Sequence, residues 1–337
     1  MFARLAVPSP LAKTLVAGTV RRRCGLAALV GNVEKSWLGD ASCSRPPNRQ
    51  GIQQQKAKSR YQKVSLFQRR HLSSPPPEVD LVLDIEAMQS SILKAAPAMA
   101  EGLCNRGHYC TGPNFIPHEA VVAMRQQAIE LRSLGRYEQS WSERIVDGKA
   151  VRFDKDGVFA CEPDGGDYFA APDLITYMAI LLQTLPGALN GETTTAEADL
   201  SASSFNAKLA VTCPGGSKYP LHIDNPQGLV AGDTRKLTCI LYLNPDYKHG
   251  DGGELRLLLD NGDETLEKVD LTPLGGRLLL FWSDEIPHEV LPTAPNGRPD
   301  DVSLDRYALT VWIPTDSAAT AIHSARSKFS NLKDLAF

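Results

Sequence analysis

Leu278-Leu-Leu-Phe-Trp282 and Arg306-Tyr-Ala-Leu-Thr-Val-Trp312 are the two runs that decide the fold. The first is continuously apolar and has the length of a strand, as expected of a strand that is buried on both faces. In the second, alternation places Arg306, Ala308, Thr310 and Trp312 on one face. Both runs therefore predict short β-strands in the C-terminal half of the chain.

Outward from these two runs, the chain becomes β-rich from residue 206 onward. Apolar and β-branched segments alternate there with turn clusters that contain Gly, Pro, Asn and Asp, which is typical of antiparallel sandwiches and barrels. The predicted strands are 207–213, 218–223, 236–243, 253–259, 265–271, 277–282, 287–291 and 305–313.

The preceding region predicts helices with a turn-rich insert. Helical periodicity covers 83–103 and 117–134, and a third helix is expected from Pro172 or Asp173 to about Leu185, ending near Pro186-Gly187. Phe115-Ile116 is interpreted as a short strand end, and 136–171 as turns with a hairpin. We expect one α+β fold, divided into a basic segment (1–79), a helical support region (80–206), a β-barrel core (207–320) and a C-terminal tail (321–337).

The charge of the chain is unevenly distributed. Residues 1–79 contain 14 Lys/Arg against 3 Asp/Glu, which gives this segment a formal charge of +11. Because the whole chain has a net charge of −3, residues 80–337 carry −14. An acid-poor, Arg- and Ser-rich N-terminus is typical of a mitochondrial transit peptide. The alternative is a disordered basic tail that contacts nucleic acid or acidic partners, and the expected location is mitochondrial or cytoplasmic. No apolar stretch approaches the roughly 20 residues of a membrane span. Seven scattered cysteines without a Cys-x-x-Cys pair favour a reducing compartment.

A metal site is predicted at His222-Ile223-Asp224. Alternation at the end of the strand 218–223 places both side chains on one face, where they can converge on one ion. His288 follows a buried strand and is the natural third ligand, although a lone core histidine is the commoner interpretation. Two imidazoles and one carboxylate are the donor set of non-haem Fe(II) oxygenases. The second His-x-Asp match, His249-Gly-Asp251, lies in a glycine-rich turn that is too exposed to hold a metal.

Arg306 predicts the second half of the site. Its guanidinium would point into the barrel, and a buried arginine is costly unless it meets a carboxylate. Asp305 faces the opposite side, so an external carboxylate is the expected partner. Tyr242 shares a face with Thr238 and Ile240 and can donate a phenol hydrogen bond to the same ligand, whereas cross-strand packing accounts equally well for Thr238 and Ile240.

These residues resemble the Fe(II)/2-oxoglutarate prolyl 4-hydroxylases, and most closely the hypoxia-inducible-factor prolyl hydroxylase branch. The likeness is dense over 207–314 and faint over 100–206. The runs that carry it are His222-Ile-Asp-Asn-Pro-Gln-Gly228, Leu237-Thr-Cys-Ile-Leu-Tyr-Leu-Asn244, Gly252-Gly-Glu-Leu-Arg256, Leu279-Leu-Phe-Trp-Ser-Asp284, Pro287-His-Glu-Val290 and Arg306-Tyr-Ala-Leu-Thr-Val-Trp312.

The resemblance implies a double-stranded β-helix, of jelly-roll or cupin-like form, that hydroxylates a proline in a protein or peptide, with a possible role in oxygen sensing. Fe(II), 2-oxoglutarate, O₂ and ascorbate would be required, and neither nucleic acid nor a membrane is expected as a partner. The implied residues are His222, Asp224 and His288 for iron, Arg306, Tyr242, Thr310, Ile240 and Leu255 for 2-oxoglutarate, and Arg235 and Trp312 for the substrate.

Two departures from the family concern the substrate and the keto acid. Cys213 stands where the family has a tyrosine before proline, so a phenol hydrogen bond to the keto acid is lost, and a thiol near iron predicts inhibition by peroxide. The loop before Arg306, with Pro295-Asn-Gly-Arg-Pro-Asp-Asp301, is also long. The alternative functions are oxidation of a small molecule or of another side chain, and a non-catalytic β-barrel binding module.

Overall fold

The computed structural model describes residues 79–146, 149–226, 233–260 and 265–317. The predicted targeting segment, apart from Val79, and the predicted C-terminal tail lie outside these residues. Three long helices support two antiparallel sheets, so the predicted α+β class is confirmed.

The helices begin and end at residues that the sequence predicts within a few positions. They are α2 (Ile85–Arg106), α3 (His118–Ser133) and α4 (Pro172–Asn190). The carboxylate of Asp84 accepts a hydrogen bond from the Ala87 N–H at the start of α2, and Gly107 ends the same helix in the left-handed region, with φ of 72°. None of the described helices is long and apolar enough to cross a membrane.

Two predicted boundaries are wrong. Helix α4 does not end at Pro186-Gly187 but continues to Asn190, because Leu185 and Leu189 are fully buried and this packing offsets the hydrogen bond that proline removes. Residues Phe115-Ile116 are not a strand end. The strand in this region is β1 (His108–Cys110), which pairs with the buried run at 279–281.

The larger sheet has seven strands in the order β1-β9-β6-β11-β4-β3-β2. The predicted hairpin in 136–171 is present, and it extends this sheet because β3 pairs with β4. The other strands of the sheet are β2 (Glu138–Val146), β3 (Lys149–Cys161), β4 (Asn206–Thr212), β6 (Arg235–Tyr242), β9 (Leu278–Trp282) and β11 (Arg306–Pro314).

The smaller sheet has four strands in the order β5-β10-β7-β8. They are β5 (Tyr219–His222), β7 (Leu255–Asp260), β8 (Leu266–Leu271) and β10 (His288–Val290). All eight strands predicted after residue 206 therefore exist, each within two residues of its predicted ends.

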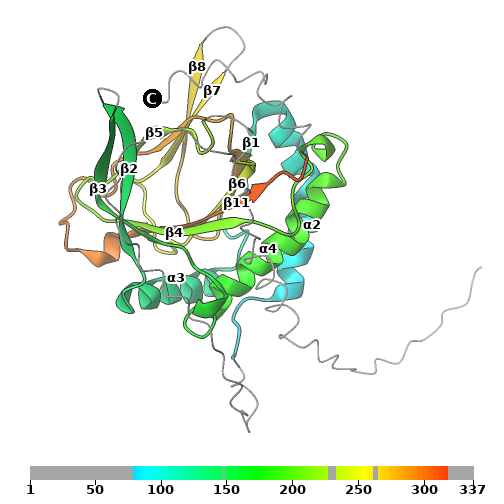
Figure 1. The fold of residues 1–337 in the computed structure, drawn as a ribbon. Helices are drawn as coiled ribbons and strands as arrows, with labels where there is room; N and C mark the ends of the chain where they lie inside the picture. The colour runs from blue at the N-terminus through cyan, green and yellow to red at the C-terminus, as the bar shows by residue number, and fades with distance from the viewer. Residues whose placement is uncertain (1–78, 147–148, 227–232, 261–264, 318–337) are drawn as a thin grey trace, which may run out of the picture.

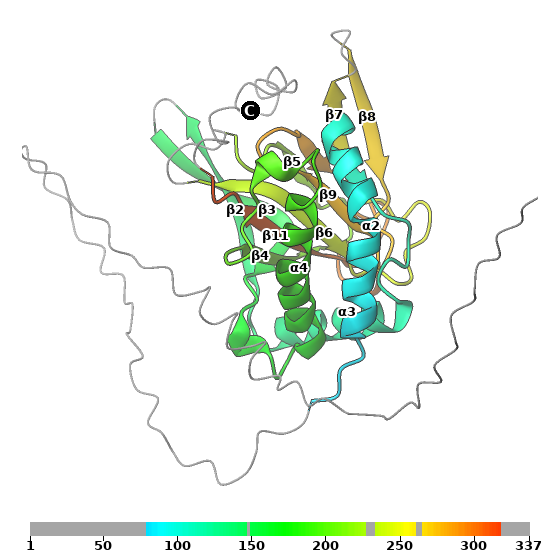
Figure 2. The ribbon, with the colours of Figure 1, turned by 90° about the vertical axis from the view of Figure 1, so that its right-hand side faces the viewer.

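Two hydrophobic cores lie on opposite faces of the larger sheet. The helices α2, α3 and α4 cover one face, and the smaller sheet lies on the other side (Figures 1 and 2). Strand β6 contributes to both cores by alternation: Cys239 and Leu241 pack toward the helices, whereas Ile240 and Tyr242 pack between the sheets. The helices therefore hold the larger sheet in place and leave its other face for the functional site.

Candidate metal and keto-acid site

A β-bulge positions the first histidine. Strands β5 and β10 pair antiparallel, with His222 opposite His288 and Tyr219 opposite Val290. Between these two pairs, two residues of β5 lie opposite one residue of β10, and the extra residue turns Tyr219 and His222 toward the same side. Pro220 fits this irregular stretch because a bulge tolerates the missing N–H.

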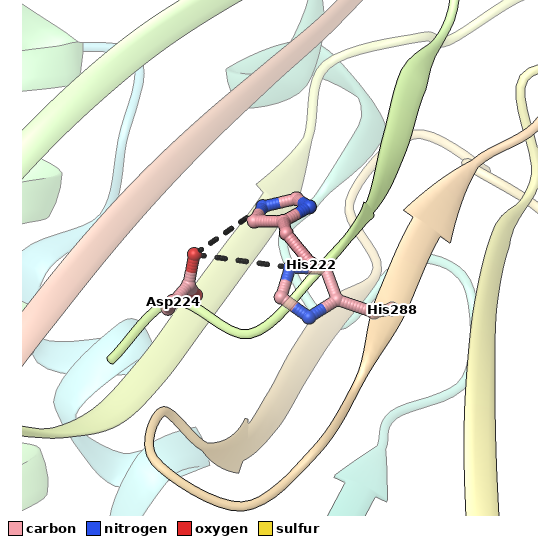
Figure 3. Close-up of side chains that lie close together, drawn as sticks. All are labelled: His222, Asp224 and His288. Carbon is pink, nitrogen blue, oxygen red and sulfur yellow. Dashed lines mark ion pairs between the residues drawn. The ribbon is translucent and has the colours of Figure 1, made fainter. Parts of the chain in front are cut away.

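His222, Asp224 and His288 converge on one point (Figure 3). Their potential ligand atoms all lie within 4.8 Å of one another. Oδ1 of Asp224 lies 3.6 Å from Nε2 of His222 and 3.8 Å from Nε2 of His288. Among the described residues, these three are the only group of histidine, cysteine and acidic side chains that is arranged to hold a metal ion.

Backbone carbonyls orient both imidazoles for metal binding. Nδ1 of His222 lies 2.8 Å from the carbonyl oxygen of Pro220, and Nδ1 of His288 lies 3.0 Å from that of Ile286. A carbonyl can only accept, so each Nδ1 carries a proton, and Nε2 is the nitrogen of each ring that faces Asp224 and can bind a metal ion. The donor chemistry therefore fits a transition-metal ion such as Fe(II).

The other oxygen of Asp224 is held by two donors. Oδ2 accepts hydrogen bonds from the Thr238 hydroxyl at 2.8 Å and from the indole Nε1 of Trp312 at 2.9 Å. The Thr238 hydroxyl also contacts that of Ser283 at 2.7 Å. Asp224 is therefore fixed so that Oδ1 alone faces the two histidines.

Burial and charge set the protonation states of the site. Burial would raise the pKa of Asp224, but His288, His222 and the Trp312 indole hold this pKa well below its usual range. Burial lowers the pKa of His288 to about 4, with a further contribution from His222 and an opposing one from Asp224. At neutral pH the site therefore presents an anionic carboxylate and a neutral imidazole at His288, the states that bind a metal ion.

Arg306 lies in the same cavity as the three residues. The cavity has a volume of about 240 Å³, and its lining includes His222, Asp224, His288 and Arg306. Arg306 is 6% exposed, its Nε donates to the carbonyl of Gly253 at 2.7 Å, and it forms no ion pair with any described residue. A buried guanidinium without a carboxylate partner is costly, and a dicarboxylate in the cavity would satisfy it.

The structure places the other predicted keto-acid residues around Arg306. Ile240, Leu255 and Thr310 line the cavity. The Tyr242 ring centroid lies 5.2 Å from the guanidinium carbon, and the buried Tyr242 hydroxyl has no hydrogen-bond partner within the described residues. Tyr242 is not among the residues that line the cavity, so this hydroxyl can donate only to a ligand group that lies against Arg306.

The two predicted substrate residues also line the cavity, but both are already engaged. Trp312 donates to Asp224, as described above. Arg235 pairs with Asp233 at 2.6 Å, and its Nη2 donates to the backbone carbonyl of Asp224 at 2.7 Å. Both residues therefore support Asp224 as well as forming part of the cavity wall.

Two residues discussed in the sequence analysis, His249 and Cys213, lie outside the cavity. His249 is exposed, and Asp251 accepts from the Lys248 N–H, as expected for a turn without a metal. Cys213 does not line the cavity but contacts Arg132 at 3.7 Å, and burial raises the pKa of its thiol. The predicted peroxide sensitivity loses its basis, because a buried thiol with a raised pKa contains little reactive thiolate.

Among the cavity residues that sequence reasoning missed, Tyr219, Lys155 and Lys208 carry polar groups. Strict alternation in 218–223 places Tyr219 and His222 on opposite faces, and only the bulge brings them together. Lys208 lies opposite Thr310 on β11, so the pairing of the two strands shows that it belongs to the cavity. The sequence of β4 alone does not indicate this. The side-chain hydroxyl of Tyr219 is buried and has no hydrogen-bond partner among the described residues.

Comparison with known proteins identifies the region that contains the site. Residues 207–314 match the family model of the 2OG-Fe(II) oxygenase superfamily. They form a 2OG-Fe(II) oxygenase domain. The matched residues include all of β4 except its first residue, the whole smaller sheet, and the three converging residues together with Arg306.

Curated relatives of the oxygenase domain include proteins named prolyl hydroxylases. Prolyl hydroxylase EGLN3 of Homo sapiens is 38% identical over 129 residues, which cover 37% of this chain and 46% of that protein. Egl nine homolog 1 of Rattus norvegicus is 28% identical over 218 residues, covering 62% of this chain and 55% of that protein. The chain thus spans about half the length of the curated relatives it matches.

Solved structures show the same fold around the oxygenase domain. A prolyl 4-hydroxylase from Phytophthora capsici is 26% identical, with a TM-score of 0.53, covering 77% of this chain and 75% of that one. A prolyl hydroxylase from Trichoplax adhaerens, in complex with a hypoxia inducible factor peptide fragment, is 23% identical, with a TM-score of 0.52, covering 67% and 92%. The predicted double-stranded β-helix is confirmed.

Proposed function

We propose that the protein is a Fe(II)- and 2-oxoglutarate-dependent dioxygenase that hydroxylates a prolyl residue in a protein or peptide. The observation that carries the proposal is the pairing of two features in one cavity: three converging metal-type donors and a buried arginine without an internal partner. A structural metal site would need the first feature alone. The second feature is expected only where an anionic co-substrate binds beside the metal.

The residues of the metal site have separate roles in this proposal. His222 and His288 would each offer Nε2, and Asp224 would offer Oδ1, while its Oδ2 stays bonded to Thr238 and Trp312. Bound Fe(II) supplies the redox chemistry in which O₂ oxidises 2-oxoglutarate to succinate and CO₂ and places one oxygen atom on the substrate. With three protein donors, coordination positions remain for the co-substrates.

The opposite end of the cavity would hold the keto acid in one orientation. Arg306 would bind its distal carboxylate, and the Tyr242 hydroxyl, which is buried and unpaired, would donate to the same group. Ile240 and Leu255 would contact the methylene groups between the two ends of the molecule. Aligning the keto acid in this way excludes water from the cavity and fixes the distance between the reacting groups.

A proline-containing substrate is supported by the names of the relatives and by the size of the cavity. About 240 Å³ is below the roughly 300–1,000 Å³ of cavities that hold whole drug-sized ligands. A cavity of this size accommodates the keto acid and one projecting side chain, with the rest of a peptide outside. Ascorbate, as a reductant that restores Fe(II), belongs to the same proposal.

Anaerobic titration of the full-length protein with Fe(II) and 2-oxoglutarate tests the site without knowledge of the substrate. Chelation of the keto acid produces a visible metal-to-ligand charge-transfer band, and we expect this band in the wild type. His288→Ala should abolish it. Arg306→Gln should weaken 2-oxoglutarate binding about a hundredfold, as expected for the loss of a buried charged hydrogen bond of roughly 3 kcal/mol.

His249→Ala is the matched control, because it removes an exposed histidine from the rival His-x-Asp pair. A band of unchanged intensity in this variant shows that the loss in His288→Ala is specific. Stoichiometric iron without any band in the wild type would contradict the proposal and favour a binding module. If the band forms, incubation with proline-containing peptides should give a +16 Da product, and succinate release with free small molecules alone would contradict a peptide substrate.

A further inference from the structure

Two lysines lie in the wall of the cavity and remain without a role. Lys155 of β3 and Lys208 of β4 line the cavity together with His222 and Asp224, and both are half-buried. The Nζ atom of Lys155 lies 4.6 Å from the centroid of the Tyr219 ring. The Nζ atom of Lys208 lies 5.6 Å from the centroid of the Trp312 ring. Aromatic rings therefore hold both ammonium groups in place.

Acidic groups near the two lysines are committed to other partners. Asp224 directs Oδ1 at the histidines and Oδ2 at Thr238 and Trp312. Asp233 pairs with Arg235 at 2.6 Å. Among the described residues, neither Lys155 nor Lys208 forms an ion pair with a carboxylate. Both side chains are half-buried, so each ammonium group has also lost part of its contact with water.

The acidic neighbours of Lys155 on its own strand do not line this cavity. Asp154 pairs with Arg152 at 2.9 Å, and both are exposed. Asp154 and Asp156 line an adjoining hollow with Lys218 and the glycines 215–216, and neither lines the cavity itself. Lys155 lines both hollows.

The two positive charges lie close enough to influence each other. Burial and, second, the charge of Lys208 lower the pKa of Lys155 to about 8, while Asp224 opposes the shift. Two half-buried ammonium groups in one cavity repel each other, and an incoming carboxylate would relieve that repulsion. The pair is thus electrostatically complementary to an anion that arrives from outside.

We propose that Lys155 and Lys208 form a carboxylate-binding subsite for an Asp or Glu side chain close to the target proline of the peptide substrate. The inference rests on the proposed function, whose substrate class it narrows. The keto acid is the other possible source of a carboxylate. Its distal carboxylate already has Arg306, which is 6% exposed, whereas the lysines are half-buried and nearer to solvent.

Paired peptides test the subsite on the full-length protein. Each pair carries one proline, with Asp or Asn, or Glu or Gln, placed at successive positions on either side of it. Binding is measured by fluorescence anisotropy under anaerobic conditions with Fe(II) and 2-oxoglutarate, and hydroxylation is measured by mass after O₂ is admitted. At one position or more, we expect the acidic peptide to bind about tenfold more tightly than its amide, the equivalent of about 1.4 kcal/mol.

Charge variants assign any preference to the two lysines. Lys155→Gln combined with Lys208→Gln should abolish the acidic preference, and Lys155→Glu combined with Lys208→Glu should favour the same peptide with Lys in place of Asp. Lys268→Gln, an exposed lysine of β8 outside the cavity, should keep the wild-type preference. A circular dichroism spectrum identifies variants that fail to fold, and the reversed preference cannot arise from misfolding.

The outcomes separate the subsite from the reaction. Equal hydroxylation of acidic and amide peptides overturns the subsite and leaves the proposed reaction intact. A preference for acidic peptides in binding, lost in the double glutamine variant, without hydroxylation supports the subsite and contradicts the reaction. Weaker 2-oxoglutarate binding in that variant without a change in peptide preference assigns the lysines to the keto acid and overturns the inference. Absence of binding and of hydroxylation for all peptides overturns both.

Discussion

The carboxylate of Asp224 has two oxygens in different environments. Oδ1 faces the two imidazoles, whereas Oδ2 is bonded to the Thr238 hydroxyl and to the Trp312 indole. Loss of a group that orients a metal ligand in this way commonly lowers metal affinity by about 10- to 100-fold. At the scale of single residues, Trp312 is therefore a support for Asp224 as well as a part of the cavity wall.

Trp312→Phe tests this role because it keeps the aromatic ring and removes the indole N–H. We expect the affinity for Fe(II) to fall by about 10- to 100-fold, since Asp224 loses one of the two donors that fix its rotamer. Isothermal titration under anaerobic conditions measures the change. Trp282→Phe is the matched control, because the Trp282 indole donates to the Leu103 carbonyl at 3.0 Å, away from the cavity. Equal iron affinity in both variants and the wild type would refute the role.

At the scale of elements, the turn before β7 supports Arg306. Gly253 has a φ of +72°, and its carbonyl accepts from Nε of Arg306. A Cβ at this position would lie 2.7 Å from Cδ of Arg306 and 3.0 Å from Oγ1 of Thr293. The absence of a side chain at residue 253 therefore leaves the space that the arginine occupies.

Gly253→Ala should displace Arg306 and weaken 2-oxoglutarate binding about tenfold, the equivalent of about 1.4 kcal/mol, within the usual range for overpacking a close contact. The charge-transfer titration measures this effect. Gly250→Ala is the control, because Gly250 also has positive φ, at +99°, but a Cβ there would meet nothing within 4 Å. If both variants weaken 2-oxoglutarate binding equally, the loss is explained by backbone strain at positive φ and not by a clash with Arg306.

Alternation along single strands explains which parts of the site the sequence predicts. The side chains of Arg306, Thr310 and Trp312 follow strict alternation on β11, so their common face is readable from the sequence. The position of Tyr219 in the cavity could not be predicted, because a bulge on β5 breaks the alternation. The position of Lys155 could not be predicted either, because the pairing of β3 with β4 brings it to the cavity. This pairing joins segments more than 40 residues apart in the sequence.

The end of α4 could not be predicted from the local sequence for a similar reason. Local rules end α4 at Pro186, but the buried leucines on either side of it hold the helix to Asn190. Helix-breaking residues express a local preference, whereas burial depends on the complete fold. Segments governed by local patterns were therefore predictable, and those governed by long-range packing were not.

At the scale of the whole molecule, one arginine joins the helical layer to the strand that contains Arg306. Arg125 of α3 donates from Nη1 to the Leu243 carbonyl at 3.0 Å and from Nη2 to the Asp305 carbonyl at 2.9 Å. Its guanidinium also lies 4.9 Å from the centroid of the Tyr307 ring. The start of β11 is thus held by the helices on the face opposite the cavity.

Arg125→Met keeps the apolar stem and leaves these carbonyl groups without their donor. We expect the free energy of unfolding to fall by about 2–3 kcal/mol, the usual loss for a hydrogen-bonded charged group with partly buried acceptors. The midpoint of urea unfolding measures the loss. Arg152→Met is the control, because the Arg152–Asp154 pair is exposed at the surface and should contribute little. Equal midpoints for both variants would show that α3 does not anchor β11.

The bonded state of Oδ2 in Asp224 also limits which ions the proposed metal site can select. Calcium favours six to eight oxygen ligands, often including a bidentate carboxylate, and this site offers one free carboxylate oxygen with two imidazoles. Millimolar calcium or magnesium should therefore be a poor competitor. Cobalt, nickel, copper and zinc bind nitrogen donors at least as well as Fe(II) does. Selectivity for iron would thus depend on which transition metals surround the protein rather than on the site itself.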